Sequence, residues 1–426
     1  MKKFIISLLF VFSFTGITFS QNVDFATYFT DKALRVDFSH SGNLNESHYY
    51  LEQLKSEPYW GGTKTNLIDP FDYGEYKVMV YSKDGTLIFT RGFTTLFQEW
   101  RTTEEAKTVS RSLYESIQIP YPKEPITFEI HTRQKDGTFI KMFSLNIDPK
   151  SYFINPELVN KYPTSEILNS GESSVKLDIV LLPEGYTAAE MDKYHRDAQR
   201  IMGYFLGCSP YKENKDNINF WTVDAPSAES GTDFPKNGIY KTTILNSSYS
   251  TFDVDRYLMT SDIKSVRDVA ANVPYDQIII LANTDVYGGG GIYNFYAFTS
   301  VDNKFTDYVA CHEFGHCLAG LADEYYTSEV GVQDYYDLNI EPYEPNITTL
   351  VNFEKKWKSM VTPGTPIPTP TIEKYVNSVG AFEGGGYVEK GVYRPMQDCT
   401  MKSIVYNKFC PVCTKAINDI IQYYCN

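Results

Sequence analysis

The sequence predicts a multidomain protein in which an N-terminal antiparallel β-sandwich-like domain precedes a domain of the α/β (α+β) class. Three observations lead to this fold class. Short runs of aromatic and β-branched residues, separated by turn signals, fill residues 21–147. From Val175 to residue 426, strand-like runs alternate with helix-like ones. Residues 148–174 between them are rich in Pro, Ser, Gly and Asn, which is typical of a linker.

Length and composition agree with this division. The chain has 426 residues, enough for two or three domains with a sizeable core. Its residues are 42% hydrophobic and 22% charged, which is typical of a globular protein and excludes a disordered or fibrous one.

Residues 1–20 have the pattern of a secretory signal peptide. Lys2 and Lys3 come first, an apolar run follows, and small residues stand near the end. The apolar run is short for a transmembrane anchor, and no cysteine follows Ser20 to accept a lipid, so an uncleaved membrane anchor is the less favoured alternative. We therefore expect export to the periplasm, the cell surface or the medium, with no membrane insertion of the mature chain.

The charge of the chain argues against two classes of partner. The net charge is −14 at pH 7, and it becomes −16 once Lys2 and Lys3 are removed with the signal peptide. An acidic protein is repelled by phosphates, so nucleic acid and anionic membrane are not expected as partners.

In the N-terminal domain, two Asp-Gly turn signals, at Asp84-Gly85 and Asp136-Gly137, predict β-hairpins. Strands are predicted on their flanks and before them, at Tyr76–Tyr81, Gly85–Thr90, Ile126–His131 and Thr138–Ile147.

The second domain opens with a buried-type strand, Lys176–Leu182, and a turn at Pro183–Tyr186. Thr187 is a suitable cap for the helix expected at Ala188–Leu206. Further strands are predicted at Ile218–Val223 and Gln277–Ala282, and a last helix at Cys413–Tyr424.

One stretch of the second domain carries recognisable chemistry, His312-Glu313-Phe314-Gly315-His316. On a helix, positions i and i+4 share a face, so both imidazoles can bind one metal ion. Glu313 then lies beside that ion and can take a proton from water. The alternative is a chance pattern on an ordinary amphipathic helix. Because the chain has only six histidines and two fall here, the sequence favours a catalytic Zn²⁺ site.

A catalytic zinc site has three protein ligands, so a third should follow the two histidines. Gly320 can end the helix in a left-handed turn, and the acidic pair Asp323-Glu324 comes next. We favour Asp323 over Glu324 as the third ligand, although spacing alone does not separate neighbours.

A glycine run at 288–291 precedes this helix, and no GxGxxG pattern opens a helix there. Gly289, Gly290 and Gly291, flanked by strand-like residues, allow close backbone approach, for example by an extended peptide at a sheet edge. A mobile surface turn is an equal alternative.

Seven cysteines are present, an odd number that leaves at least one free thiol. We expect Cys311 and Cys317, beside the histidines, to be buried apolar residues. In an exported protein, those between Cys399 and Cys425 can form disulfides. Cys410-Pro-Val-Cys413 is one lone CxxC pair, so a structural zinc or redox site is the less favoured interpretation.

The stretch His312-Glu-Phe-Gly-His-Cys-Leu-Ala-Gly-Leu-Ala-Asp-Glu-Tyr325 resembles the signature of the bacterial immunoglobulin A peptidase family of zinc metalloendopeptidases. Supporting stretches are Leu182–Thr187, Ser227–Pro235, 288–291, Tyr393–Pro395, Cys399–Met401 and Phe409–Cys413. The resemblance covers about residues 175–426, and such proteins also have a β-rich N-terminal domain.

More broadly, the chain resembles the metzincin clan, in which His-Glu-x-x-His-x-x-Gly-x-x-His or Asp is followed by a methionine turn. Here Gly320 and Asp323 each come one residue later than in that pattern. The resemblance implies that Met401 forms the methionine turn, with a plain core methionine as the alternative. It also implies that 289–291 is an edge strand that pairs with substrate, and that Tyr393 or Tyr406 supplies a hydroxyl to the oxyanion.

The favoured hypothesis is therefore an exported zinc endopeptidase that acts on protein or peptide substrates, with Glu313 as the general base. The alternative is a surface glycan- or protein-binding module with a structural or vestigial metal site, for which Trp60 and Trp100 would be suitable aromatics. Hydrolysis of a non-peptide amide would use the same site. The sequence leaves the natural substrate, the disulfide pairing and the oligomeric state open.

Overall fold

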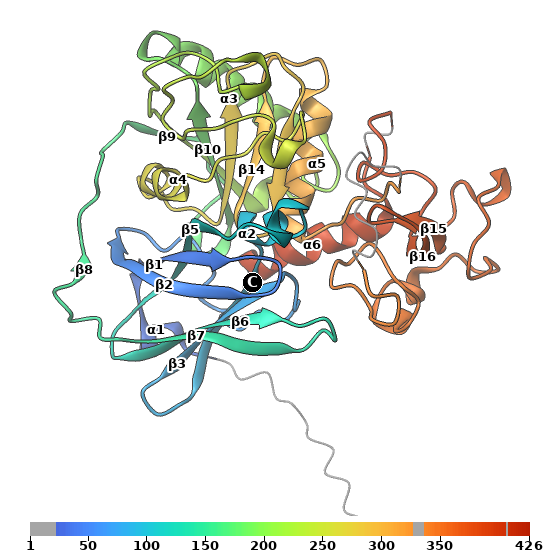
Figure 1. The fold of residues 1–426 in the computed structure, drawn as a ribbon, viewed down its shortest axis with the longest axis horizontal. Helices are drawn as coiled ribbons and strands as arrows, with labels where there is room; N and C mark the ends of the chain where they lie inside the picture. Colours follow the sequence, from blue (N-terminus) through green and yellow to red (C-terminus); the bar gives the residue numbers. More distant parts are fainter. Residues whose placement is uncertain (1–22, 327–335, 406–407) are drawn as a thin grey trace, which may run out of the picture.

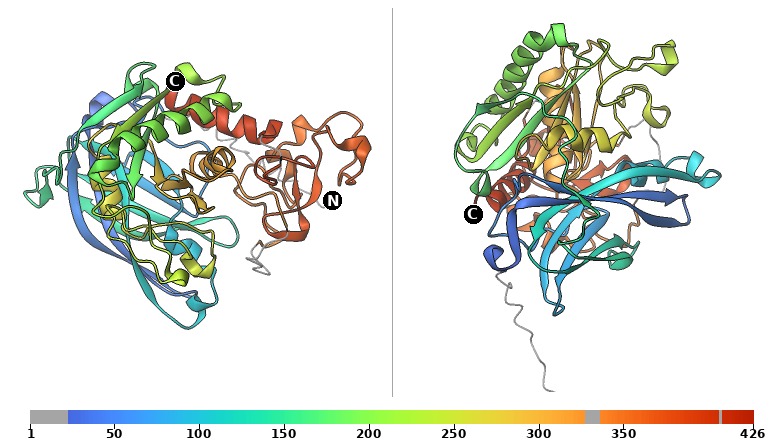
Figure 2. Two further views of the ribbon diagram at one scale, coloured as in Figure 1. Left: turned by 90° about the horizontal axis from the view of Figure 1, so that it is seen from above. Right: turned by 90° about the vertical axis from the view of Figure 1, so that its left-hand side faces the viewer.

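A computed structural model describes residues 23–326, 336–405 and 408–426. The predicted signal peptide, residues 1–20, lies outside the described residues. Two β-sheet regions lie one against the other, and a C-terminal part extends to one side (Figures 1 and 2). None of the helices in the described residues is long and apolar enough to cross a membrane.

The N-terminal region consists of two four-stranded sheets, ordered β5-β1-β2-β8 and β4-β3-β6-β7. All pairs are antiparallel except β2 with β8. The strands are β1 Phe29–Gly42, β2 Ser47–Glu57, β3 Tyr76–Ser82, β4 Leu87–Phe93, β5 Arg111–Pro122, β6 Ile126–Arg133, β7 Phe139–Ile147 and β8 Ile154–Asn155. The two helices of this region are α1 Phe25–Tyr28 and α2 Leu96–Arg101.

Both N-terminal sheets contribute to one hydrophobic core. Alternate residues of β1, such as Val36 and Phe38, are apolar and lie in this core with Val78 and Val80 of β3 and Phe128 of β6. This alternation is what a strand with one apolar face produces. The four predicted strands are found as β3, β4, β6 and β7, whereas the longer β1, β2 and β5 were not predicted.

The second region is built on a six-stranded mixed sheet in the order β13-β14-β12-β10-β11-β9. Its central strands run parallel, and both edge strands, β9 and β13, are antiparallel to their neighbours. The strands are β9 Thr164–Leu168, β10 Leu177–Glu184, β11 Ile218–Val223, β12 Gln277–Ala282, β13 Gly289–Ile292 and β14 Tyr296–Ser300. Strand β9 comes from the predicted linker, so part of residues 148–174 extends this sheet.

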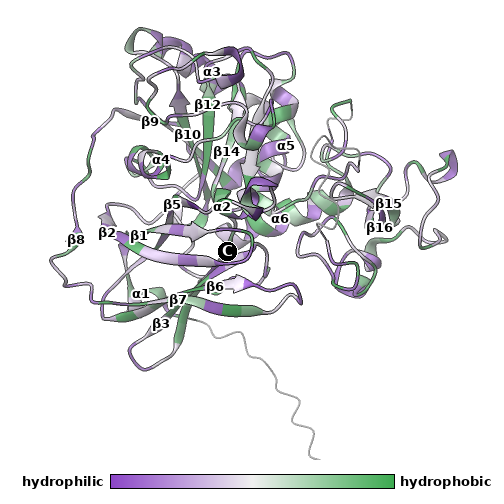
Figure 3. Ribbon diagram, viewed as in Figure 1, coloured by the Kyte–Doolittle hydropathy of each residue, from purple (hydrophilic) through white to green (hydrophobic). Residues whose placement is uncertain are grey.

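The central strands are almost entirely buried and mostly hydrophobic (Figure 3), because helices cover both of their faces. Helices α3, α5 and α6 pack on one face and α4 on the other. Their bounds are α3 Met191–Gly207, α4 Ile263–Ala270, α5 Thr306–Ala319 and α6 Pro411–Cys425. The remaining hairpin, β15 Phe382–Gly385 and β16 Val388–Arg394, belongs to the C-terminal part beside α5 and α6 (Figure 1).

Local sequence explains why two of these helices begin and end where they do. Thr187 and Glu190 form a reciprocal capping box just before α3, as the predicted cap requires. Gly320 ends α5 with φ 57°, a left-handed conformation in which glycine has no Cβ clash.

The two regions meet through buried charges and backbone contacts. Arg35 of β1 and Lys55 of β2 contact the Asp268 carboxylate of α4, at 2.8 and 2.7 Å. The backbone N–H of Thr94 donates to the Tyr293 carbonyl at 3.0 Å. Helix α2 follows Thr94, so the N-terminal region reaches the edge of the second sheet close to β13.

Candidate metal centre

Helix α5 carries the two histidines and holds them in place. Most of its residues are buried. Phe314, Cys317 and Leu318 pack into the core that α5 shares with α3 and α6 on one face of the sheet. As expected for i and i+4, His312 and His316 lie on one face, with their Nε2 atoms 3.2 Å apart.

Each imidazole is also held through its other nitrogen. Nδ1 of His312 lies 3.0 Å from the Thr400 carbonyl, and Nδ1 of His316 lies 2.5 Å from the Leu321 carbonyl. A carbonyl only accepts hydrogen bonds, so each neutral ring carries its proton on Nδ1. Both Nε2 lone pairs are therefore free to bind a metal ion.

Asp323 faces the same point. Its Oδ1 atom lies 3.1 Å from Nε2 of His312 and 3.4 Å from Nε2 of His316. Its Oδ2 atom accepts hydrogen bonds from the hydroxyls of Tyr325, at 2.8 Å, and Tyr387. Oδ1 is buried, and among the described residues it has no hydrogen-bond donor in suitable geometry. An orphaned carboxylate oxygen beside two imidazole nitrogens is the arrangement that a metal ion would complete.

These three atoms are compatible with zinc. Tetrahedral bonds of about 2.0–2.2 Å place neighbouring ligand atoms about 3.3–3.5 Å apart. The three separations observed here are 3.1, 3.2 and 3.4 Å. The donor set, two imidazoles and one carboxylate, is also one that catalytic zinc sites use.

Glu324 lies elsewhere. Its side chain is fully buried, and Oε1 lies 3.2 Å from Sγ of Cys413 and 3.0 Å from the amide nitrogen of Asn346. The structure thus brings Asp323, and not Glu324, to the histidines.

Glu313 lies beside the histidines and is half-buried. One of its carboxylate oxygens is within 4.8 Å of a ring nitrogen of each histidine. Burial raises the pKa of Glu313, and the charges of His312 and His316 partly oppose this. A carboxylate with a raised pKa is a stronger base at neutral pH, which is what a general base requires.

Charged groups of the cluster shift one another's pKa values. Burial lowers the pKa of His316, but the Asp323 carboxylate outweighs it and raises that pKa to about 9. Burial would raise the pKa of Asp323, yet the two imidazoles hold it well below its usual range. The cluster therefore attracts positive charge at its centre.

Met401 lies under the histidine helix. It is fully buried, and its carbonyl accepts a hydrogen bond of 2.7 Å from the Glu324 N–H. A Cβ placed on Gly315 would lie only 3.0 Å from the Met401 sulfur. Met401 thus packs against α5 at Gly315, a residue that lies between the two histidines in sequence and has no side chain.

The glycine run forms most of strand β13 and explains how β13 lies so close to α5. A Cβ on Gly291 would stand 2.0 Å from the Glu313 carbonyl oxygen, and one on Gly289 would stand 2.7 Å from a Val309 methyl. Gly289 already uses its outward-facing N–H and carbonyl, which bond with Arg256 and Leu258 at 3.3 and 3.2 Å. Glycine is therefore required here by packing, whatever else the strand does.

The two tyrosines considered for the oxyanion have different outcomes. Tyr406 lies outside the described residues. Tyr393 lies on β16, where its backbone pairs with Thr348, and within the described structure no contact joins its hydroxyl to the four residues of the cluster. Tyr308 is nearer, since its hydroxyl lies 3.2 Å from Nδ1 of His312.

Several residues of the centre escaped sequence reasoning. Thr400 and Leu321 act through backbone carbonyls, which leave no sequence signal. Tyr387 comes from the C-terminal hairpin, far from the histidines in sequence. Tyr325 is the last residue of the stretch 312–325, and this position was the one sequence signal for its place in the centre. Glu99 of α2 was also missed. Burial raises its pKa to about 7, its carboxylate accepts a hydrogen bond from Tyr257, and the charges of His316 and Glu313 act on it.

Models of known protein families match both regions of the chain. A family model described as IgA Peptidase M64 matches residues 165–378 and 371–421, and one described as Peptidase M64 N-terminus matches residues 24–144. No curated protein matches the chain.

Proposed function

The chain belongs to the IgA Peptidase M64 family, and from this premise we propose that it is a zinc-dependent endopeptidase that cleaves protein substrates. Family membership by itself supports peptidase activity. The metal, the base and the residues that hold them are our proposal, with His312, His316 and Asp323 as ligands and Glu313 as the general base.

One observation carries the proposal. Two Nε2 atoms and one carboxylate oxygen converge with separations of 3.1–3.4 Å, and a carboxylate that is not needed as a ligand lies next to them. A structural zinc site fills its fourth position with a protein ligand, whereas a catalytic site leaves it open. An acid beside an open position can accept and donate protons, which is the role we assign to Glu313.

When bound, zinc would supply Lewis acidity, which polarises a peptide carbonyl and lowers the pKa of water. The chain's own residues do the rest. Thr400 and Leu321 hold the imidazoles in the required tautomer, and Tyr325 and Tyr387 hold Asp323. Glu313 accepts the proton of the attacking water and gives it to the leaving amine. The positive charge of Arg256 also acts on Glu313.

Three further expectations belong to this proposal. Residues 1–20 direct export, residues 21–147 form a sandwich-like domain, and the peptidase region is metzincin-like with Met401 in its methionine turn. For substrate binding, Gly289 uses its outward groups within the chain, and Gly290 directs its N–H and carbonyl toward β14. We therefore place the pairing edge of β13 at Gly291.

The binding-module hypothesis has less support. Trp60 and Trp100, which would have served as exposed aromatic contacts, are 6% and 0% exposed. Trp100 also donates a hydrogen bond of 2.7 Å to Glu105, which is typical of a satisfied core residue. Both are therefore explained by packing.

The test compares the mature protein with Glu313→Gln in the digestion of a diverse peptide mixture, read by mass spectrometry. Zinc content is measured on both proteins. Loss of a general base is expected to lower the cleavage rate about 10²- to 10⁴-fold while the zinc content stays unchanged.

Two outcomes would reject parts of the proposal. A zinc-loaded Glu313→Gln protein with full activity would exclude Glu313 as the base. A zinc-loaded wild type that cuts neither peptides nor folded proteins would favour the binding-module hypothesis instead.

A further inference from the structure

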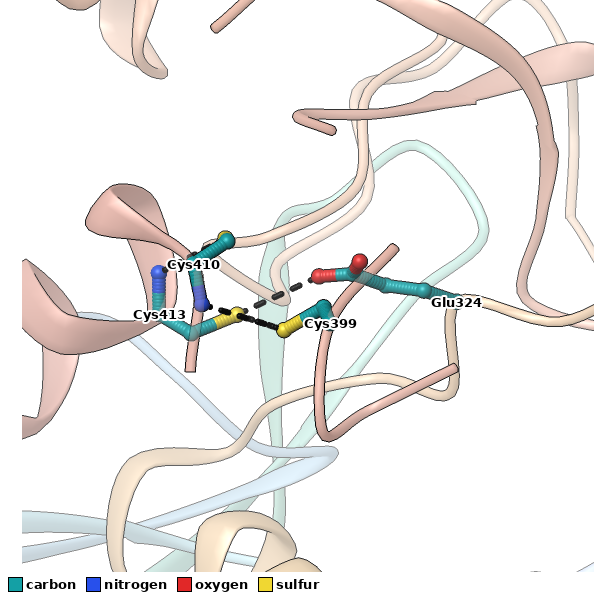
Figure 4. A group of neighbouring side chains, drawn as sticks. All are labelled: Glu324, Cys399, Cys410 and Cys413. Atoms are coloured by element: carbon teal, nitrogen blue, oxygen red, sulfur yellow. Dashed lines mark hydrogen bonds between the residues drawn. The ribbon is translucent and has the colours of Figure 1, made fainter. Parts of the chain in front are cut away.

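A second group of potential metal ligands adjoins the first, because Glu324 follows Asp323 in the chain. It consists of Glu324, Cys399, Cys410 and Cys413, whose ligand atoms all lie within 4.8 Å of one another. Figure 4 shows the Glu324 carboxylate pointing toward the sulfur of Cys413, with Cys399 beside it. The four side chains come from three segments: the chain after α5, the turn before Met401, and the start of α6.

The group is closed to solvent. Glu324, Cys399 and Cys413 are 0% exposed and Cys410 is 2% exposed. Oε2 of Glu324 has no hydrogen-bond partner in the described structure. Burial of a charged carboxylate oxygen without a partner is strongly unfavourable, so a native structure is expected to supply a partner. A cation at the centre of the group would be that partner.

The spacing of the sulfurs fits a metal better than a disulfide. Sγ of Cys399 and Sγ of Cys413 are 3.8 Å apart. Two sulfurs bound to one tetrahedral zinc at about 2.3 Å stand about 3.8 Å from each other, whereas a disulfide requires about 2.05 Å. The carboxylate oxygen, 3.2 Å from Sγ of Cys413, is within a few tenths of an ångström of its expected place.

Backbone groups also support thiolates here. The N–H of Cys410 donates to Sγ of Cys399 at 3.3 Å, and the N–H of Cys413 donates to Sγ of Cys410 at 3.4 Å. Cys410 caps α6, a helix of 15 residues, whose N-terminal dipole favours negative charge. Sulfur atoms that accept hydrogen bonds at a helix N-terminus are suited to the ionised form that binds metal.

We propose that Cys399, Cys410, Cys413 and Glu324 form a second, structural zinc site, separate from the centre at His312. Three thiolates and one carboxylate complete a tetrahedron, so no position stays open for water and the site does no chemistry. Soft sulfur ligands select zinc over magnesium or calcium.

The position of this site gives it a function. Glu324 follows Asp323, and Cys399 precedes Thr400, whose carbonyl holds His312. The Glu324 N–H also bonds to the Met401 carbonyl. One ion that joins Glu324 to Cys399 therefore fixes the two segments that supply Asp323 and Thr400 to the first centre. Its ligands are positioning residues for the peptidase site.

The test uses the full-length mature protein purified without reductant or chelator. We expect one zinc ion per chain beyond the ion at His312. His312→Ala should lose the first ion and keep the second. After substitution with cobalt, the His312→Ala protein should show thiolate-to-metal charge-transfer absorption, because only sulfur ligands produce it. Failure of the peptidase hypothesis would leave these results unchanged.

Variants locate the ion. Cys413→Ser is expected to remove the second ion and the absorption band. Cys208→Ser changes a cysteine outside the group and is the matched control, expected to keep both. A second measurement does not depend on the folding of Cys413→Ser. The wild type is denatured with chelator, and all seven cysteines should then react as free thiols.

Two results would overturn the proposal. One is a thiol count lower by two together with a peptide pair joined by a disulfide between members of the group. The other is a folded His312→Ala protein that binds no zinc.

Discussion

Two potential metal centres each use one residue of the pair Asp323-Glu324. They differ in exposure to solvent and in whether an acid remains beside the ligands. At the first, His316 and Glu313 are half-buried and an acid lies next to the ligands. At the second, all four side chains are buried and each one is used. An open position with a spare acid is suited to catalysis, whereas a closed set of ligands is suited to holding chain segments together. Adjacent residues can therefore serve opposite purposes when the chain directs them to different sides.

Chelation should separate the two centres most strongly. A chelator reaches the half-buried first centre, so we expect all peptidase activity to be lost while the sulfur-bound ion stays. Zinc content and cleavage rate, followed together over time, measure this. Simultaneous loss of both ions, in step with unfolding by circular dichroism, would show that the closed centre is no better protected than the open one.

Protons should compete with metal at the first centre. Because the pKa of His316 is raised to about 9 in the metal-free protein, its ring is protonated at pH 7 and must lose that proton to bind zinc. We expect the affinity of metal-free protein for zinc to fall as pH drops below 9, by up to about tenfold per pH unit.

Zinc titrations at several pH values, with competing chelators of known affinity, measure this slope. The closed centre also depends on pH, because its thiols must lose protons to bind zinc. His312→Ala is therefore titrated alongside the wild type to measure that dependence separately. A flat profile in wild type would contradict the coupling between His316 and Asp323.

The close packing of β13 on α5 gives a test that concerns stability. Gly291→Ala places a methyl about where the Glu313 carbonyl oxygen lies, 2.0 Å away, so strand and helix must separate. We expect a loss of about 1–3 kcal/mol in the free energy of unfolding and a lower cleavage rate, because Glu313 moves with the helix.

Gly203→Ala is the control for this substitution. Gly203 lies in α3, and a Cβ there meets nothing within 4 Å, so alanine should stabilise the helix by up to about 1 kcal/mol. Denaturant unfolding of both variants measures the difference. An unchanged Gly291→Ala protein would mean that β13 does not depend on this contact.

The smallest effect is expected at Tyr387. Tyr387→Phe removes one of two hydroxyls that donate to Oδ2 of Asp323. Loss of such a supporting hydrogen bond lowers metal affinity about tenfold, and the zinc content of the sulfur centre should not change. An equal loss at both centres would indicate general destabilisation.

Much of the first centre was predictable because its signals are local. A period of 3.6 residues places His312 and His316 on one face, and a glycine at position 320 is the expected end of the helix. Strands β11 and β12 were predicted with their observed bounds, since both are short apolar runs between turn signals. The hairpins at Asp84-Gly85 and Asp136-Gly137 follow from turn chemistry in the same way.

What sequence by itself determined here is therefore the histidine helix, its glutamate and the short strands, each of which depends on neighbours along the chain. The tertiary structure alone placed Asp323, and not Glu324, beside the histidines. It also brought the Thr400 and Leu321 carbonyls to the imidazoles and Glu324 to three cysteines more than seventy residues away. Contacts of this kind depend on how distant segments pack, and no periodicity along the chain records that packing.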